Sequence, residues 1–246
     1  MRRAIRGRGR GAGAAVVVMG LGAVLAACSS GTPKAAGSAD GGTVAEVRAV
    51  ADSGTLAGLP ARVEGAAITV GEQDAPHTVK VYEDARCPYC KKFEEGGARA
   101  LTQSVASGDV KIEYTIASFL DGNLGGSGSV NAANALRASV DAGKFPEFHA
   151  AVFANQPDDE SQDAYTNAFL LKIAGKVDGL RSTAFDEAVN GGAYEKWVGD
   201  AMQAFRDDGM QGTPTVLIDG KKAGGGEDAL YGKASFAAVL KDAGIS

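Results

Sequence analysis

The chain has 246 residues, of which 45% are hydrophobic and 22% are charged. Such a chain can bury a core large enough to fold by itself, which excludes a small protein held together by disulfides. The formal net charge of -5, from 30 acidic and 25 basic residues, argues against nucleic acid as a partner. Three cysteines are too few for a disulfide scaffold, so a close pair of them is better explained by its chemistry.

The first 27 residues have the order of an export signal. Five arginines lie among the first ten residues, and an apolar run from Ala14 to Ala27 follows them. This run is short for a membrane-spanning helix and typical of a signal-peptide core. It ends in Leu25-Ala26-Ala27-Cys28, which resembles a bacterial lipobox and implies that Cys28 is lipidated. An ordinary secretion signal is the alternative, and Arg2-Arg3 gives weak support to a twin-arginine signal.

The segment after Cys28 is a predicted tether. Residues 29–46 are rich in serine, glycine and alanine, and as a random coil they span roughly 25 Å. Without the leader the chain has 20 basic and 30 acidic residues, so its surface does not attract anionic lipid. We therefore expect the lipid on Cys28 to anchor the protein to the outer face of the cytoplasmic membrane.

From residue 64 the hydrophobic pattern predicts an α/β domain. "TVKVYED" and "VKIEYTIASF" alternate like strands, and the helix between them should bend at Gly96-Gly97. Residues 121–129 are rich in glycine, and helical spacings without a strand follow as far as residue 211. Strands resume at "TPTVLI", with Asp219-Gly220 favouring a type I′ turn, and a helix from Ala234 to Ala243 ends the chain.

Two cysteines stand at the start of the first predicted helix, in the motif Cys87-Pro88-Tyr89-Cys90. Proline suits the first turn of a helix, because the N–H that it lacks would be unpaired there. At a helix N-terminus, backbone N–H groups and the helix dipole lower a thiol pKa from about 8.5 to about 3.5–7.5. Cys90 lies on the same face, one turn deeper. The motif therefore predicts an exposed attacking sulfur at Cys87 and a shielded resolving sulfur at Cys90.

Two other interpretations of the pair stay open. A zinc site needs four ligands, whereas His77 lies in a solvated turn and His149 on an apolar helical face where packing explains it better. A structural bridge across two residues would remove little entropy from the unfolded chain. We expect no metal, and no cofactor other than the redox-active disulfide Cys87-Cys90.

Three segments together resemble the DsbA-like thiol-disulfide oxidoreductases of the thioredoxin superfamily. They are "VYEDARCPYCKKFE", "FPEFHAAVFANQP" and "GTPTVLIDG", and the resemblance covers residues 64–246. It implies an α/β thioredoxin fold with a mixed central sheet and an inserted α-helical domain. It also implies that Pro214 is cis and lies against the active-site disulfide, leaving the Thr213 backbone free to pair with an extended substrate.

The resemblance divides the chain into five parts. They are the lipoprotein signal peptide 1–27, the lipidated cysteine and tether 28–63, the first part of the thioredoxin fold 64–120, the helical insertion 121–211, and the second part of the thioredoxin fold 212–246.

The chain departs from the family pattern at two positions. Tyr89 stands where the best-known members carry a histidine, whose positive charge favours the thiolate. Val81 stands six residues before the first cysteine, where many relatives have a buried acid that relays protons. Glu83 is the candidate substitute, on condition that the strand continues that far.

The predicted function is thiol-disulfide exchange with exported proteins by a monomeric enzyme outside the cytoplasm. Cys87 and Cys90 are the predicted catalytic residues, supported by Pro88, Tyr89, Thr213 and Pro214. A dithiol oxidase is favoured because the compartment is oxidising, and an unknown membrane redox partner would take the electrons. The alternatives are a disulfide reductase on the same site, and a lipoprotein that binds peptides or acts as a chaperone with idle cysteines.

Overall fold

The computed structural model describes residues 47–48 and 56–245. The predictions about the signal peptide, Cys28 and most of the tether lie outside the described residues. β1 (Ala61–Glu64) and β2 (Ala67–Val70) form an antiparallel hairpin. Among the described residues, the first strand therefore starts at Ala61, inside the segment that was predicted to be a tether.

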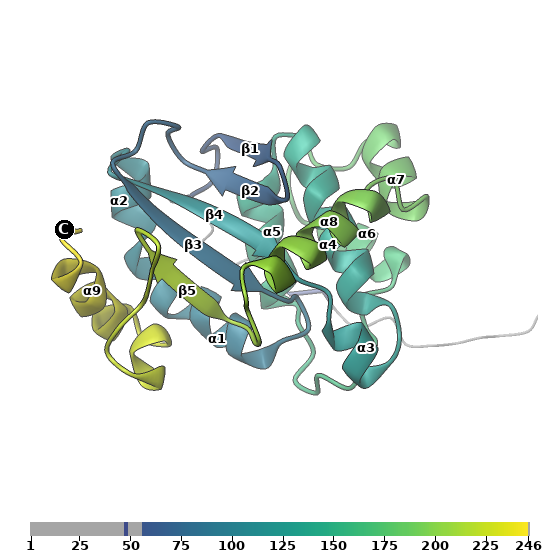
Figure 1. The fold of residues 1–246 in the computed structure, drawn as a ribbon. Helices are drawn as coiled ribbons and strands as arrows, with labels where there is room; N and C mark the ends of the chain where they lie inside the picture. The colour runs from purple at the N-terminus through teal and green to yellow at the C-terminus, as the bar shows by residue number, and fades with distance from the viewer. Residues whose placement is uncertain (1–46, 49–55, 246) are drawn as a thin grey trace, which may run out of the picture. The chain divides into compact units, whose positions relative to one another are not determined.

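In the part of the chain that the structure describes, six strands form one mixed sheet in the order β1-β2-β4-β3-β5-β6 (Figure 1). The two central strands, β3 (His77–Glu83) and β4 (Val110–Ile116), run parallel. β2 pairs antiparallel with β4, and β5 (Thr215–Ile218) pairs antiparallel with β3. β6 (Lys221–Lys222) lies at the edge. The predicted mixed central sheet is confirmed.

Side chains of β3 alternate between two covered faces of the sheet. Val79 and Val81 are completely buried in the main core. Tyr82 points to the other face, where its ring lies 6.1 Å from the ring of Phe205 in α8 (Glu195–Asp207). Both faces are covered near the carboxyl end of β3, where Val81 and Tyr82 are buried, whereas Lys80, on the same face as Tyr82, is partly exposed.

The connection from β3 to β4 bends where the sequence predicted it. α1 (Pro88–Glu95) is followed by η1 (Gly97–Ala100) and α2 (Thr102–Ala106). A Cβ atom on Gly96 or Gly97 would collide with the carbonyl oxygens of Tyr231 and Leu230. The two glycines therefore allow a close backbone approach, which explains the bend better than their low helix propensity does.

Between β4 and β5 the described chain holds helices and no strand, as predicted for the insertion. In Figure 1 most of these helices gather at one end of the sheet, whereas α9 (Lys233–Asp242) lies at the other end. The helices of the insertion that precede α8 are α3 (Leu120–Leu124), α4 (Gly128–Asp141), α5 (Phe145–Ala154), α6 (Asn167–Ala174) and α7 (Thr183–Asn190).

The turn between β5 and β6 has the predicted type I′ geometry. Asp219 and Gly220 have positive φ angles of 47° and 78°, and Ile218 pairs directly with Lys221. Asp219 also lies 2.8 Å from the ring of His77. His77 is the first residue of β3, so its assignment to a turn was wrong, while its side chain is partly exposed.

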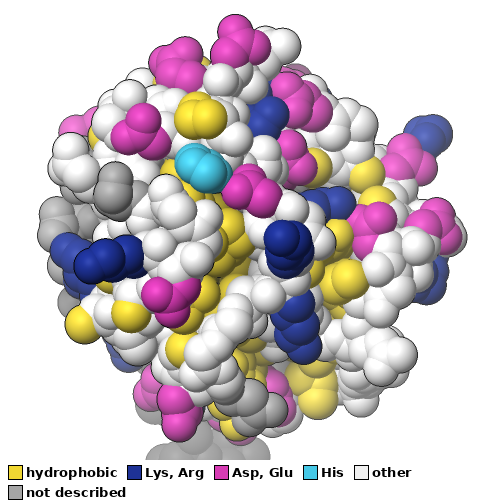
Figure 2. Space-filling model, turned by 60° about the vertical axis from the view of Figure 1, so that its left-hand side comes forward, with side chains coloured by type: hydrophobic (Ala, Val, Ile, Leu, Met, Phe, Trp, Pro, Cys, Tyr) yellow, Lys and Arg dark blue, Asp and Glu magenta, His cyan; other side chains and the backbone are white. Residues whose placement is uncertain are grey.

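The described residues show the following features of the surface. Within the described part of the chain, no helix is both long and apolar enough to cross a membrane. On the face shown in Figure 2, acidic and basic side chains are mixed, and hydrophobic side chains line a furrow between them.

Candidate active site

Cys87 and Cys90 lie just beyond the carboxyl end of β3. Cys87 is the N-cap residue of α1, with φ -72° and ψ 119°, and Pro88 is the first residue of the helix. The Cys87 N–H donates to the carbonyl oxygen of Asp84 at 2.9 Å, and the Lys91 N–H donates to the carbonyl oxygen of Cys87 at 3.2 Å. The predicted position of Cys87 at a helix N-terminus is confirmed.

Both cysteines are free thiols in this structure. Cys90 is completely buried, as predicted for a resolving sulfur, and Cys87 is only 6% exposed. The two cysteines pack with Phe153 of α5 and with Leu120. The prediction of an openly exposed attacking sulfur was therefore wrong, because the helical insertion and the segment before β5 cover Cys87. Tyr89, between the two cysteines, is 52% exposed.

The register of β5 brings Thr213 to Cys87. Thr215 pairs with Tyr82, so the residues before Thr215 run alongside the segment that leads to the cysteines. The Cys87 Sγ atom donates to the carbonyl oxygen of Thr213 at 3.2 Å. The Thr213-Pro214 peptide bond is cis, as the resemblance implied.

The two thiols have opposite pKa shifts. The pKa of Cys87 is lowered to about 6, first by the hydrogen bond from the Cys90 thiol. Burial opposes this shift, while the Thr213 side chain and the backbone N–H groups of Cys90 and Tyr89 add to it. Burial raises the pKa of Cys90 well above its usual range. Cys87 is therefore mainly a thiolate at neutral pH, and the helix N–H groups are a secondary cause of its acidity.

A largely buried cluster of Glu83, Glu94 and His149 lies next to the cysteine motif, with the Glu94 side chain 11% exposed. Glu83 is the last residue of β3, Glu94 follows Cys90 by one turn of α1, and His149 belongs to α5. The Nε2 atom of His149 lies 2.5 Å from Oε1 of Glu83, and its Nδ1 atom lies 3.8 Å from Oε2 of Glu94. β3 therefore does continue to Glu83, which was the condition for this residue to substitute for the acid missing at Val81.

Burial sets the protonation of this cluster. It raises the pKa of Glu83 well above the usual range and that of Glu94 to about 8, while it lowers the pKa of His149. The charge of Glu83 is also among the causes that raise the pKa of Cys90. The cluster therefore holds protons at neutral pH and is coupled electrostatically to the resolving cysteine. His149 is buried as expected, but it has a hydrogen-bonding role that packing alone did not predict.

The same cluster offers three ligand atoms within 4.8 Å of one another. A zinc site requires its donor atoms to point at one centre. Here the two ring nitrogens of His149 face different carboxyl groups. Glu83 Oε2 and Glu94 Oε1 are buried without a hydrogen-bond partner among the described residues. The arrangement suits proton exchange better than metal binding.

Buried charges that the sequence analysis missed hold the turn before α1. Asp84 accepts a hydrogen bond from the hydroxyl of Ser129 at 2.7 Å, and burial raises its pKa to about 6. The guanidinium group of Arg86 donates to Asp121 at 2.8 Å. These partners are 45 and 35 residues apart in the chain, so no local pattern in the sequence could have paired them.

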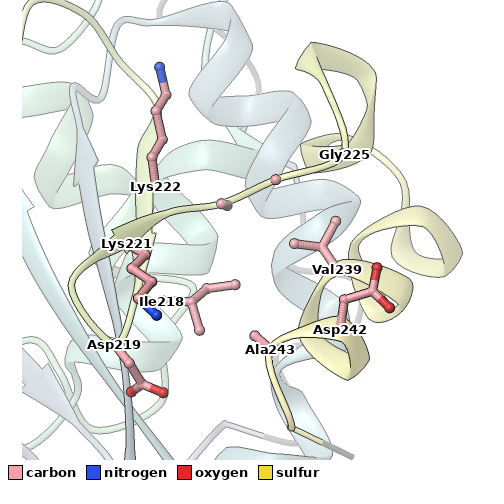
Figure 3. Close-up of a pocket in the computed structure, with 10 residues that line it drawn as sticks. Ile218, Asp219, Lys221, Lys222, Gly225, Val239, Asp242 and Ala243 are labelled. Atoms are coloured by element: carbon pink, nitrogen blue, oxygen red, sulfur yellow. The ribbon is translucent and has the colours of Figure 1, made fainter.

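A cavity of about 390 Å³ lies between the β5-β6 hairpin and α9, as Figure 3 shows. Ile218 of β5 and Val239 of α9 face each other across it, and Lys222 points away from it. Neither cysteine nor Thr213 is among its lining residues. The cavity is therefore separate from the redox pair.

Residues 64–234 match the family model described as Thioredoxin, which covers more than half of the chain. The chain belongs to the thioredoxin family. It is 28% identical to disulfide bond formation protein D of Bacillus subtilis over 155 residues, which make up 62% of this chain and 67% of the relative. It is also 25% identical to the serine/threonine-protein kinase PknE of Mycobacterium tuberculosis, but the match spans 29% of the kinase and 63% of this chain.

Solved structures of thioredoxin-like enzymes superpose on this family member. Reduced DsbA from Mycobacterium tuberculosis gives a TM-score of 0.58 at 26% identity, covering 73% of this chain and 93% of that one. Oxidised BdbD from Bacillus subtilis gives a TM-score of 0.59 at 24% identity, covering 76% of this chain and 95% of that one. The comparisons confirm the predicted thioredoxin fold and enzyme class, a DsbA-like thiol-disulfide oxidoreductase.

Proposed function

We propose that this thiol-disulfide oxidoreductase works outside the cytoplasm as an oxidase of exported protein dithiols, with Cys87 and Cys90 as its redox pair. The observation that carries the proposal is the opposite ionisation of the two thiols, with the pKa of Cys87 at about 6 and that of Cys90 raised. A stable Cys87 thiolate stabilises the reduced enzyme. An enzyme with a stable reduced form gives up its disulfide readily, which is the property of an oxidase.

In the proposed cycle, a substrate thiolate attacks Sγ of Cys87 in the disulfide form of the enzyme. A mixed disulfide forms, and the sulfur of Cys90 leaves as a thiolate that takes up a proton. A second substrate thiolate then attacks the substrate sulfur of the mixed disulfide, and Cys87 leaves as a thiolate. The substrate loses two electrons and two protons. The enzyme gains two electrons and one proton, and the other proton goes to solvent.

The cluster of Glu83, Glu94 and His149 is proposed to supply the proton that Cys90 takes up. Glu94 lies one turn after Cys90, and its pKa of about 8 keeps it largely protonated at neutral pH. A short hydrogen bond joins His149 to Glu83, and the other ring nitrogen of His149 lies 3.8 Å from Glu94. Glu83 thus takes the part of the buried acid that the chain lacks at Val81.

Thr213 and Tyr89 are proposed to hold the substrate beside Cys87. The 3.2 Å contact between Cys87 Sγ and the Thr213 carbonyl means that a cysteine delivered to Cys87 passes along the Thr213 backbone. An extended segment can pair there as an added strand. The Tyr89 ring is exposed and lies 5.9 Å from the ring of Tyr231, which presents an aromatic surface to the substrate. Pro88 and Pro214 shape the backbone on the two sides of Cys87.

Export and anchoring belong to the same proposal. The order of basic, apolar and Leu-Ala-Ala-Cys segments supports a signal peptide at 1–27 and lipidation of Cys28. We retain 28–63 as the anchor and tether, with β1 starting at Ala61 within its last residues, 64–120 and 212–246 as the two parts of the thioredoxin fold, and 121–211 as the insertion. The enzyme is proposed to be a monomer that reacts with thiols and disulfides of exported proteins and is reoxidised by a membrane redox partner.

Equilibration of the purified protein with glutathione tests the direction of electron flow. A reduction potential near about -120 mV would support the oxidase, and one near about -270 mV would support the reductase. Cys87→Ser tests the peptide-binding alternative. If cells that carry Cys87→Ser form disulfides in exported proteins as well as the wild type does, the cysteines are idle and the proposal fails.

A further inference from the structure

Gln156 lies just after α5, in the helical insertion, and its amide group reaches the segment that precedes α1. The residue is 2% exposed. Its Nε2 atom donates to the carbonyl oxygen of Ala85 at 2.6 Å and to that of Cys87 at 3.0 Å. Its own backbone carbonyl oxygen accepts from Nζ of Lys91 at 3.1 Å. Gln156 therefore contacts the chain on both sides of the α1 N-terminus.

The chemistry of these contacts is specific to an amide side chain. A glutamine NH₂ group has two hydrogens, and both are used on the two carbonyl oxygens. A carboxylate of the same shape has no hydrogen to donate, and an apolar side chain of the same length leaves both carbonyl groups without this partner. The second carbonyl belongs to Cys87 itself, so the amide acts directly on the backbone of the reactive residue.

We propose that Gln156 is a positioning residue of the redox site, an inference that rests on the proposed role of Cys87 as the attacking sulfur. Gln156 holds the backbone of residues 85–87 so that the Cys87 sulfur stays within reach of the Cys90 thiol and of the N–H groups at the start of α1. The helical insertion thereby helps to stabilise a thiolate that belongs to the thioredoxin part of the fold.

The neighbouring residue, Asn155, provides a matched control. It is also a buried amide, 7% exposed, at the end of α5. Its side chain, however, accepts from the Arg48 N–H at 2.6 Å and donates to the Ala151 carbonyl oxygen at 2.8 Å. Asn155 thus holds a different segment of the chain. Replacing its amide group should lower the stability of the fold without changing the pKa of Cys87.

The test is a pH titration of the Cys87 thiolate in the reduced full-length protein, followed by ultraviolet absorbance and by the rate of alkylation. We expect Gln156→Met to raise the pKa of Cys87 by about one unit, a tenfold loss of thiolate at pH values below the wild-type pKa. The equilibrium constant with glutathione should shift toward the disulfide form. Asn155→Leu should lower the temperature of unfolding and leave the titration unchanged.

If Gln156→Met folds and the pKa of Cys87 is unchanged, the proposal is overturned. Gln156 would then contribute only to the stability of the fold. An equal shift in Asn155→Leu also overturns it, because any loosening of the α5 end would then suffice. If Gln156→Met does not fold, Gln156→Leu, which removes both donor hydrogens without adding a charge beside Cys87, decides by the same titration. The difference between variant and wild type tests this inference, whereas the absolute potential of the wild type tests the proposed oxidase.

Discussion

His149 and Glu83 share one short hydrogen bond, with 2.5 Å between Nε2 of the imidazole and Oε1 of the carboxyl group. Both side chains are almost completely buried. The contact joins the last residue of β3 to the helical insertion, 66 residues away in the chain. It brings an imidazole to the carboxyl group whose charge helps to raise the pKa of Cys90. The insertion therefore contributes a residue, His149, to the proton-exchanging cluster that we propose, in addition to covering the sheet.

Removal of the Cys90 thiol should make Cys87 less acidic. The hydrogen bond from Cys90 is the largest cause of the lowered Cys87 pKa, so Cys90→Ala should raise this pKa from about 6 toward its ordinary value. Alkylation rate as a function of pH measures the change. Tyr89→Phe, which keeps the Cys90 thiol, should titrate like the wild type. A Cys90→Ala protein that still titrates near pH 6 would show that the helix N-terminus suffices.

A histidine in place of Tyr89 should make the enzyme more oxidising. An imidazolium next to the N-cap of α1 would stabilise the Cys87 thiolate and hence the reduced enzyme. A gain of about 1.4 kcal/mol in the reduced form corresponds to about 30 mV in the two-electron potential. We expect Tyr89→His to raise the potential by an amount of this order below the pKa of the new imidazole, and Tyr89→Phe to leave it near the wild-type value. A potential unchanged by Tyr89→His would contradict this account.

Burial of Glu94 should make the stability of the protein depend on pH. Its pKa is raised from 4.5 in the unfolded chain to about 8 in the folded protein, first by burial. The folded state therefore binds this proton more tightly, so its stabilising effect is complete below pH 4.5 and is lost as the pH rises toward 8. Each unit of pH in this window costs at most about 1.4 kcal/mol for one such group.

Urea unfolding at a series of pH values measures this dependence. Glu94→Gln should flatten the decline in the free energy of unfolding between pH 5 and 8, but only partly, because Glu83 remains and titrates in the same direction. The control is Glu95→Gln, which alters the exposed neighbouring carboxyl group and should keep the wild-type slope. Equal slopes in wild type and Glu94→Gln would show that Glu94 is not the protonated group.

A methyl group at Gly97 should destabilise the fold. The Cβ atom of Gly97→Ala would meet the carbonyl oxygen of Leu230, so the segment before α9 has to move away from η1. Overpacking of this kind costs about 1–3 kcal/mol, and thermal unfolding would detect it. Gly122→Ala in α3 is the control, because its Cβ meets nothing within 4 Å and the substitution should be neutral or slightly stabilising. Equal unfolding temperatures for the two variants would refute the close-approach explanation of the bend.

The sequence by itself determined the features that depend on neighbours along the chain. Pro88 predicted the N-terminus of α1 and placed Cys87 at its N-cap, because a proline ring and a missing N–H act within one helical turn. Asp219-Gly220 predicted the type I′ turn for the same local reason, and period-two alternation predicted β4. The resemblance carried by the cysteine motif and the Thr213-Pro214 segment extended these predictions to the thioredoxin fold.

Only the tertiary structure decided how the site works in detail. It placed Thr213 over Cys87 across 126 residues of sequence, His149 against Glu83 across 66, and Gln156 against Cys87 across 69. Burial and hydrogen bonding depend on which segments pack together, and no periodicity along the chain records those partners. For this reason the sequence analysis overestimated the exposure of Cys87. It also could not predict the cluster of Glu83, Glu94 and His149, because these residues belong to β3, α1 and α5 and are brought together only by the fold.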